Sequence, residues 1–155
     1  MTFQICALPK APFQHFFDRS DSQLVAQNAR RVIADEKPGF PCRVSLKDAE
    51  PGEELVLVNH QHLSGNSPYD AAHAIYVRKN AAQAQPAAGM VPDVLACRLL
   101  SVRGFDAECM MRDADVVDGK NLAAKLEEML ANPDIAFVDI HNAKQGCFAA
   151  KAVRA

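Results

Sequence analysis

The sequence lacks a marked excess of charge of either sign. Its 155 residues carry 17 Lys and Arg against 19 Asp and Glu, which gives a formal net charge of −2 at pH 7. Proteins that bind nucleic acids or membrane surfaces without specificity depend on clustered basic side chains. We therefore expect neither a nucleic acid nor a membrane among the partners of this protein.

Long hydrophobic runs and paired cysteines are also missing. No stretch approaches the roughly 20 apolar residues of a membrane-spanning helix, and the first residues do not resemble a secretory signal. The five cysteines are widely spaced and contain no C-x-x-C pair. An odd number of separated cysteines is typical of a reducing compartment rather than of a disulfide framework. The expected location is the cytoplasm.

Motifs of well-known cofactor sites are absent. The glycine-rich phosphate and dinucleotide loops, the serine nucleophile elbow and the H-E-x-x-H zinc motif do not occur. The aspartates of 113–118 do not have the spacing of a calcium loop. His60 and His62 are not followed by the glutamate of a cupin-type metal site, and we expect them in an exposed loop at 59–70. The sequence thus predicts no cofactor and no bound metal.

The apolar residues predict an α+β fold in a single domain over residues 1–155. Hydrophobic content is 49%, which excludes a disordered chain, although alanines inflate that figure. Short apolar runs outnumber helical patterns, so we expect an antiparallel or mixed sheet of five to seven strands with two or three helices. A capping box at Ser20 predicts a helix over 21–35, and the Ala/Gln/Pro-rich stretch at about 80–90 predicts a mobile loop. Further helices are expected at 92–97 and 119–131, and strands at 43–46, 55–58, 73–78, 98–103, 109–117, 135–140 and 147–153.

Four segments carry a recognisable set of motifs in a fixed order. They are KPGFPCRVSL and DAEPGE within 37–53, SPY and HAIYVR within 67–78, DADVVDG at 113–119, and HNAKQGCFAA at 141–150. Together they resemble a bacterial family known only as domain of unknown function 1203, over nearly the whole chain. The resemblance implies a protein of about this length, and it brings no activity, cofactor or site residue with it.

The same segments hold side chains with the chemistry of a reactive site. Cys42 follows a rigid Phe-Pro step, His73 begins a strand, and His141 and Cys147 flank an expected turn at 142–146. A thiolate is a nucleophile whose formation a neighbouring cation favours, and a histidine can serve as its general base. We therefore take Cys42, His73, His141 and Cys147 as the candidate catalytic residues. The other three cysteines, Cys6, Cys97 and Cys109, are expected to be structural.

Three functions remain open for these residues. The first is nucleophilic catalysis by Cys42 or Cys147, with Asp139 as the less favoured orienting group for His141. The second is zinc binding by two cysteines and two histidines, which the lack of short ligand spacings disfavours. The third is binding of a small anionic ligand by Arg43, Tyr69, Asn142 and Lys144, with the cysteines and histidines only lining the pocket. A purely structural role competes with all three, because free cysteines often pack as small hydrophobic residues.

The leading hypothesis is a domain that binds a small anionic or carbonyl-bearing molecule. In the enzymatic version of this hypothesis, the domain also converts the molecule chemically. The alternative is a non-catalytic protein-interaction module that uses an exposed strand edge or the helix over 21–35. The sequence does not decide whether the protein is an enzyme. It also leaves the oligomeric state open, and a homodimer is compatible with it.

Overall fold

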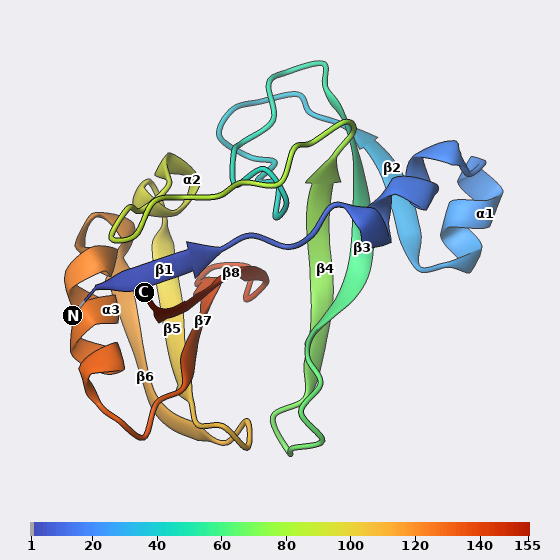
Figure 1. Cartoon of the computed structure of the whole chain (residues 1–155). Helices are drawn as coiled ribbons and strands as arrows, with labels where there is room; N and C mark the ends of the chain where they lie inside the picture. The colour runs from blue at the N-terminus through green and yellow to red at the C-terminus, as the bar shows by residue number, and fades with distance from the viewer. Residues whose placement is uncertain (1) are drawn as a thin grey trace.

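The computed structural model describes residues 2–155, and their strands form two antiparallel sheets that lie side by side (Figure 1). Sheet A has the order β1-β8-β7-β5-β6 and sheet B the order β2-β3-β4. The predicted α+β class is confirmed, but the strands are divided between two sheets. The strands are β1 (Phe3–Cys6), β2 (Ala29–Ile33), β3 (Glu54–Leu63), β4 (Ala71–Arg78), β5 (Leu99–Phe105), β6 (Met111–Asp118), β7 (Phe137–Asn142) and β8 (Phe148–Arg154).

The helical segments are short. The α-helices are α1 (Asp21–Ala26), α2 (Asp93–Ala96) and α3 (Leu122–Ala131), and the 3-10 helices are η1 (Ala11–Asp18) and η2 (Gly119–Asn121). Within the part of the chain that the structure describes, no helix is long and apolar enough to cross a membrane.

Helix α3 covers the outer face of sheet A, as Figure 1 shows. Its apolar stripe packs on alternate residues of the sheet, because side chains one turn apart share a helix face and every second strand residue points to one side. The stripe consists of Leu122, Leu126, Met129 and Leu130, all buried. Asp118 begins this helical region by accepting a hydrogen bond from the Lys120 backbone N–H at 3.2 Å. The prediction of a helix over 119–131 is confirmed.

Gly119 allows α2 to lie directly against the start of that helical region. A Cβ atom at this position would overlap the carbonyl oxygen of Leu95. The Gly119 N–H also donates to the carbonyl oxygen of Arg98 at 2.8 Å. The contact holds the segment between α2 and β5 in a defined place, which matters for the site described below.

The prediction of one helix over 21–35 is wrong. The capping box exists, with Ser20 and Gln23 bonded reciprocally at 2.9 and 3.3 Å, but α1 ends at Ala26. Asn28 then adopts a positive φ of 54°, which asparagine tolerates better than most residues. Residues 29–33 continue as β2 and pair with β3, where the β-branched Val32 and Ile33 fit a pleated surface.

Two further predictions near sheet B are wrong. Strand β3 extends to Leu63, so His60 and His62 lie in a strand and are partly buried rather than in an exposed loop. Residues 43–46 form a tight turn instead of a strand, with Leu46 N–H donating to the Cys42 carbonyl at 3.0 Å and Leu46 at a φ of 50°. The 80–90 stretch is irregular, as expected, and the backbone N–H groups of Ala84 and Gly89 attach it to Val44 and Phe3.

Arg43 joins the two sheets. Its backbone N–H donates to Tyr76 of β4 at 3.1 Å, and its side-chain Nε donates to the carbonyl oxygen of Phe148 in β8 at 2.7 Å. Arg43 belongs to the connection 34–53, which lies at one end of sheet B, and the connection 79–92 runs from that end across to α2 beside sheet A (Figure 1). This end of the intersheet junction is where the candidate site lies.

Candidate functional site

A cavity of about 540 Å³ opens at the junction of the two sheets. Its wall combines three parts of the chain: the 36–43 connection, strands β3 and β4 of sheet B, and the β7–β8 turn with the start of β5 from sheet A. The cavity brings together most of the residues that the sequence singled out, namely Arg43, His73, Asn142, Lys144 and Cys147.

Arg43 is a buried cation that has no carboxylate partner among the described residues. It is 2% exposed, and its guanidinium donates to the Phe148 carbonyl at 2.7 Å, the Pro41 carbonyl at 2.5 Å and Cys147 Sγ at 3.0 Å. Burial lowers the pKa of Arg43, and the neighbouring Cys147 opposes that shift. Removing a charge from water is unfavourable unless an opposite charge compensates it. Among the three groups that accept from Arg43, only the Cys147 sulfur can ionise.

The β7–β8 turn fixes Cys147 opposite Asn142. The Asn142 N–H donates to the Cys147 carbonyl at 2.9 Å, and Gly146 supplies the positive φ of 79° that the turn requires. The Asn142 side chain is 4% exposed, and its Nδ2 lies 3.5 Å from Cys147 Sγ. Its Oδ1 has no hydrogen-bond partner within residues 2–155. A buried acceptor without a donor therefore lies beside the thiol.

Arg98 and Cys97 also line this cavity, although the sequence suggested a structural role for Cys97 and gave no reason to single out Arg98. The Arg98 guanidinium binds Asp48 at 2.6 and 2.9 Å, and its Nη1 lies 3.4 Å from Cys97 Sγ. Burial acts to lower the pKa of Arg98, but the hydrogen bond and charge of Asp48 raise it overall. Asp48 and Arg98 are 50 residues apart, and no local sequence pattern connects them.

The remaining predicted site residues lie elsewhere. Cys42 is buried in a hydrophobic cluster, where its Sγ accepts from the backbone N–H groups of Ser45 and Arg78 at 3.4 and 3.3 Å. Tyr69 lies in the β3–β4 loop with its ring 5.9 Å from that of Phe105. Neither Cys42 nor Tyr69 borders the cavity that contains Cys147.

His141 points to the other face of β7 from Asn142, because neighbouring strand residues alternate. It is 1% exposed, and its Nδ1 contacts the Gly146 carbonyl at 3.0 Å. Its ring packs against those of His62 and Phe148, at centroid distances of 4.8 and 5.9 Å. Burial lowers the pKa of both His62 and His141 to about 4, so both are neutral at pH 7. His141 belongs to the packing between the sheets rather than to the cavity.

Asp139 lies two residues before His141 and is 1% exposed. Neither of its carboxylate oxygens has a hydrogen-bond partner among the residues that the structure describes, and Lys151 Nζ lies 3.8 Å away. Burial raises the pKa of Asp139 to about 6, although the charges of Lys151 and Arg103 act in the opposite direction. Asp139 does not orient His141 by a hydrogen bond.

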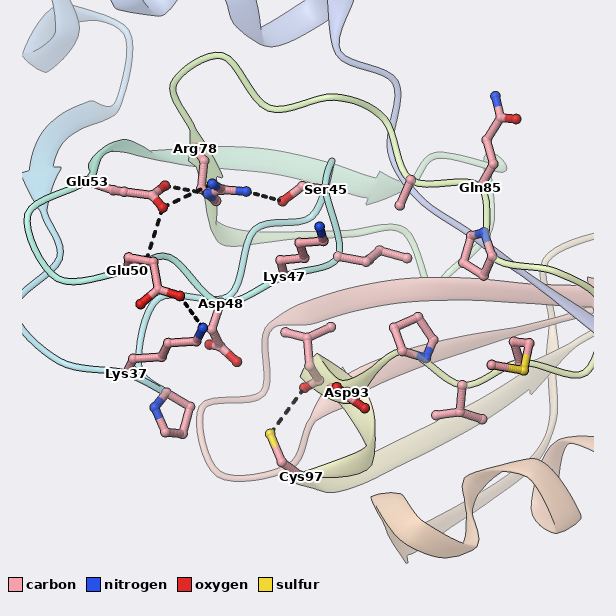
Figure 2. Close-up of a pocket in the computed structure, with 18 of the residues that line it drawn as sticks. Lys37, Ser45, Lys47, Asp48, Glu50, Glu53, Arg78, Gln85, Asp93 and Cys97 are labelled. Atoms are coloured by element: carbon pink, nitrogen blue, oxygen red, sulfur yellow. Dashed lines mark hydrogen bonds and ion pairs between the residues drawn. The ribbon is translucent and has the colours of Figure 1, made fainter.

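A larger cavity of about 980 Å³ lies beside the first, with Pro38 and Cys97 bordering both. Figure 2 shows ion pairs on one of its walls: Lys37 with Glu50, and Arg78 with Glu53 at 2.5 and 3.0 Å. Apolar side chains of the 84–94 segment line much of the rest. These charges neutralise each other, and within the described chain no buried side-chain polar atom of this wall is left unpaired. The smaller cavity is therefore the stronger candidate despite its size.

The four candidate cysteine and histidine ligands do not form a metal site. Cys147 and His73 line the cavity, whereas Cys42 and His141 face other surroundings. Within residues 2–155, no group of three or more His, Cys, Asp or Glu side chains is arranged to hold a metal ion.

The family described as protein of unknown function (DUF1203) matches residues 39–154. The chain belongs to this family. The resemblance predicted from the four sequence segments is thereby confirmed. No curated protein and no solved structure matches the chain. The family match includes every residue of the cavity wall except Glu36 and Pro38. It assigns no activity, so function has to be argued from the cavity itself.

Proposed function

We propose that the intersheet cavity binds a small anionic or carbonyl-bearing molecule and that Cys147 acts on this molecule as a nucleophile. The observation that carries the proposal is the contact of 3.0 Å between the buried Arg43 guanidinium and Cys147 Sγ. A cation at this distance stabilises a thiolate, which is the nucleophilic form of cysteine. The thiolate in turn compensates the charge of Arg43 in a place where water cannot.

The other residues of the wall suit an anionic ligand. Lys144 is exposed at the opening, and Arg98 adds a second guanidinium to the wall. Asn142 Oδ1, which has no partner among the described residues, can accept a hydrogen bond from a donor group of the ligand. Arg98 is paired with Asp48, whereas Lys144 has no ion-pair partner within residues 2–155 and is the cation of the wall that is available to attract an anion.

His73 supplies the proton chemistry in this proposal. It lines the cavity from β4, on the sheet opposite Cys147. When the Cys147 thiolate adds to a carbonyl group of the ligand, its sulfur forms a bond to the carbonyl carbon. The carbonyl oxygen gains the electron pair of the broken carbon–oxygen π bond. A protonated His73 donates a proton to that oxygen, and it accepts the proton again when the adduct breaks down.

Alkylation of the full-length protein with iodoacetamide tests the nucleophile. Peptide mass spectrometry would follow the rate at each cysteine between pH 5.5 and 8.5. We expect Cys147 to be alkylated faster than Cys97 below pH 7, although Cys97 is the more exposed thiol. A Cys97→Ser variant provides the matched background. Alkylation of Cys147 that is slower than that of Cys97 throughout this range, or that requires denaturation, would refute the nucleophile.

Ligand binding needs a separate measurement. Thermal shift in the presence of small 2-oxo acids, simple carboxylates and inorganic phosphate would show which class stabilises the protein. The Lys144→Ala variant is expected to weaken the shift by any of these anions while leaving the melting temperature of the free protein unchanged. Equal stabilisation of the two proteins by every anion would contradict a role of Lys144 in binding.

The alternative, a protein-interaction module, has less support. The helix predicted over 21–35 does not exist, which removes one of its two surfaces. The other is an exposed strand edge, and among the edge strands β1, β2, β4 and β6 it is β6 whose residues are mostly exposed. Strand β6 carries Arg112, Asp113 and Asp115, and charged side chains on an edge strand oppose pairing with another chain. The cavity is therefore the preferred functional site.

A further inference from the structure

The surroundings of Cys147 Sγ have a feature that carbonyl chemistry does not require. Arg43 contacts the sulfur on one side, and the Asn142 carboxamide lies beside it with Nδ2 at 3.5 Å and Oδ1 unpaired. Both side chains are more than nine-tenths buried. Cys147 itself is 7% exposed and borders an open cavity. The sulfur is thus accessible to small molecules only. The Asn142 carboxamide beside it holds an acceptor oxygen that has no donor in the part of the chain that the structure describes.

We propose that Cys147 also reacts with hydroperoxides and is oxidised to a sulfenic acid, which donates a hydrogen bond to Asn142. This oxidation regulates ligand binding and catalysis in the cavity. The inference rests on the proposed thiolate at Cys147, and it adds an oxidant class and a regulatory role to that site.

The reaction balances with the hydroperoxide as the only oxidant. The Cys147 thiolate attacks the terminal oxygen of the hydroperoxide, so that a sulfur–oxygen bond forms and the oxygen–oxygen bond breaks. The leaving alkoxide or hydroxide takes up a proton and departs as an alcohol or water. The sulfur is oxidised by two electrons and the hydroperoxide is reduced by two. Arg43, already beside the sulfur, stabilises the negative charge that moves onto the leaving oxygen.

The sulfenic acid provides a hydrogen-bond donor that the thiolate lacks. Its hydroxyl group is a hydrogen-bond donor, and Asn142 Oδ1 is the buried acceptor that lacks one. The added oxygen also occupies space in the cavity and removes the thiolate that compensates Arg43. Oxidation therefore both blocks nucleophilic attack and changes the charge that an anionic ligand meets. A thiol reductant would restore the original state, because sulfenic acids are reduced by thiols through a mixed disulfide.

Hydrogen peroxide is the probe for the test, applied to the full-length protein with dimedone to trap sulfenic acid. We expect the trap at Cys147, with a mass increase of one oxygen atom in its absence. Because the buried Arg43 guanidinium contacts Cys147 Sγ at 3.0 Å, we expect Cys147 to react on the order of tenfold faster than the exposed Cys97. Trapping at Cys97 or Cys109 in preference to Cys147 would overturn the inference.

The Asn142→Ala variant tests the role of the carboxamide. It leaves the backbone hydrogen bonds of the turn and the contacts of Arg43 in place, and circular dichroism would verify its fold. We expect the sulfenic acid to form in this variant as well. Its further oxidation to sulfinic acid should be at least about threefold faster than in the protein that retains Asn142. An unchanged lifetime would contradict the proposed hydrogen bond to Asn142.

The outcomes distinguish this inference from the proposed function. Rapid alkylation of Cys147 by iodoacetamide together with slow oxidation by peroxide would overturn the inference and leave the nucleophile in place. Slow reaction with both reagents would overturn both proposals, because each depends on the thiolate.

Discussion

Replacing Asp139 with asparagine is expected to stabilise the protein at neutral and alkaline pH. Asp139 is buried in sheet A, where neither carboxylate oxygen has a hydrogen-bond partner within residues 2–155 and Lys151 Nζ lies 3.8 Å away. Burial raises its pKa from 3.8 to about 6. The ionised carboxylate is therefore a source of instability in the folded state, and a neutral side chain of the same shape removes it.

The magnitude follows from the shift in pKa. A shift of one pKa unit corresponds to about 1.36 kcal/mol, so a rise from 3.8 to about 6 corresponds to roughly 3 kcal/mol. The folded state holds the Asp139 proton more tightly than the unfolded state does. The stabilising contribution of the protonated form is complete below about pH 4, falls as the pH rises, and is lost above about pH 6. The asparagine variant would have no such loss, although it gives up the attraction of Lys151.

The assay is urea denaturation of both proteins at pH 8 and pH 4, followed by far-UV circular dichroism because the chain contains no tryptophan. We expect the Asp139→Asn variant to be about 1–3 kcal/mol more stable at pH 8 and nearly equal to the unmodified protein at pH 4. Asp134→Asn, at an exposed position, is the matched control and should change stability little at either pH. A variant that is no more stable than the unmodified protein at pH 8 would refute the reasoning.

Three further predictions concern the packing around the site. Burial lowers the pKa of His141 to about 4, so the contribution of this residue to stability is lost as the pH falls from about 6.5 to 4, opposite in sign to that of Asp139. His141→Gln should remove this contribution in pH-dependent urea denaturation, and an unchanged pH dependence would contradict it. Asp48→Asn leaves the partly buried Arg98 without its carboxylate and should lower the free energy of unfolding by about 2 kcal/mol in the same assay; no loss would mean that the pair contributes little. Gly119→Ala places a Cβ atom in the space of the Leu95 carbonyl oxygen. Thermal denaturation should show that the free energy of unfolding falls by at least about 2 kcal/mol. An unchanged melting temperature would show that α2 can move away freely.

Local signals are sufficient to predict much of sheet A from the sequence. Helix α3, its Asp118 cap and the pairing of β5 with β6 depend on residues close together in the chain. The prediction for 21–35 fails because its apolar residues fit both a helix and a helix followed by a strand. The deciding factor is the pairing of β2 with β3, more than 20 residues further along the chain, which no local pattern contains.

The site shows the same division between local and distant contacts. Asn142, Lys144 and Cys147 belong to one turn, so their proximity can be inferred from the sequence. A pairing of Cys147 with His141 does not form, because the alternation along β7 turns the side chain of Asn142, and not that of His141, toward the sulfur. Arg43 and Arg98 reach the cavity through contacts with residues about 100 and 50 positions away. The sequence names Arg43 as a candidate for anion binding, but its burial and its contact with Cys147 could not be inferred because the two residues are 104 positions apart.

Arg43 couples the folding of the protein to the chemistry of the cavity. Its main chain is bonded to β4, its Nε to β8 and its Nη2 to the candidate nucleophile. Any substitution of Arg43 therefore disturbs the junction of the two sheets as well as the thiol, and a loss of reactivity in such a variant would not identify its cause. Lys144 and the Asn142 carboxamide do not join the sheets. These two side chains are the positions at which ligand binding and thiol oxidation can be altered while the junction stays intact.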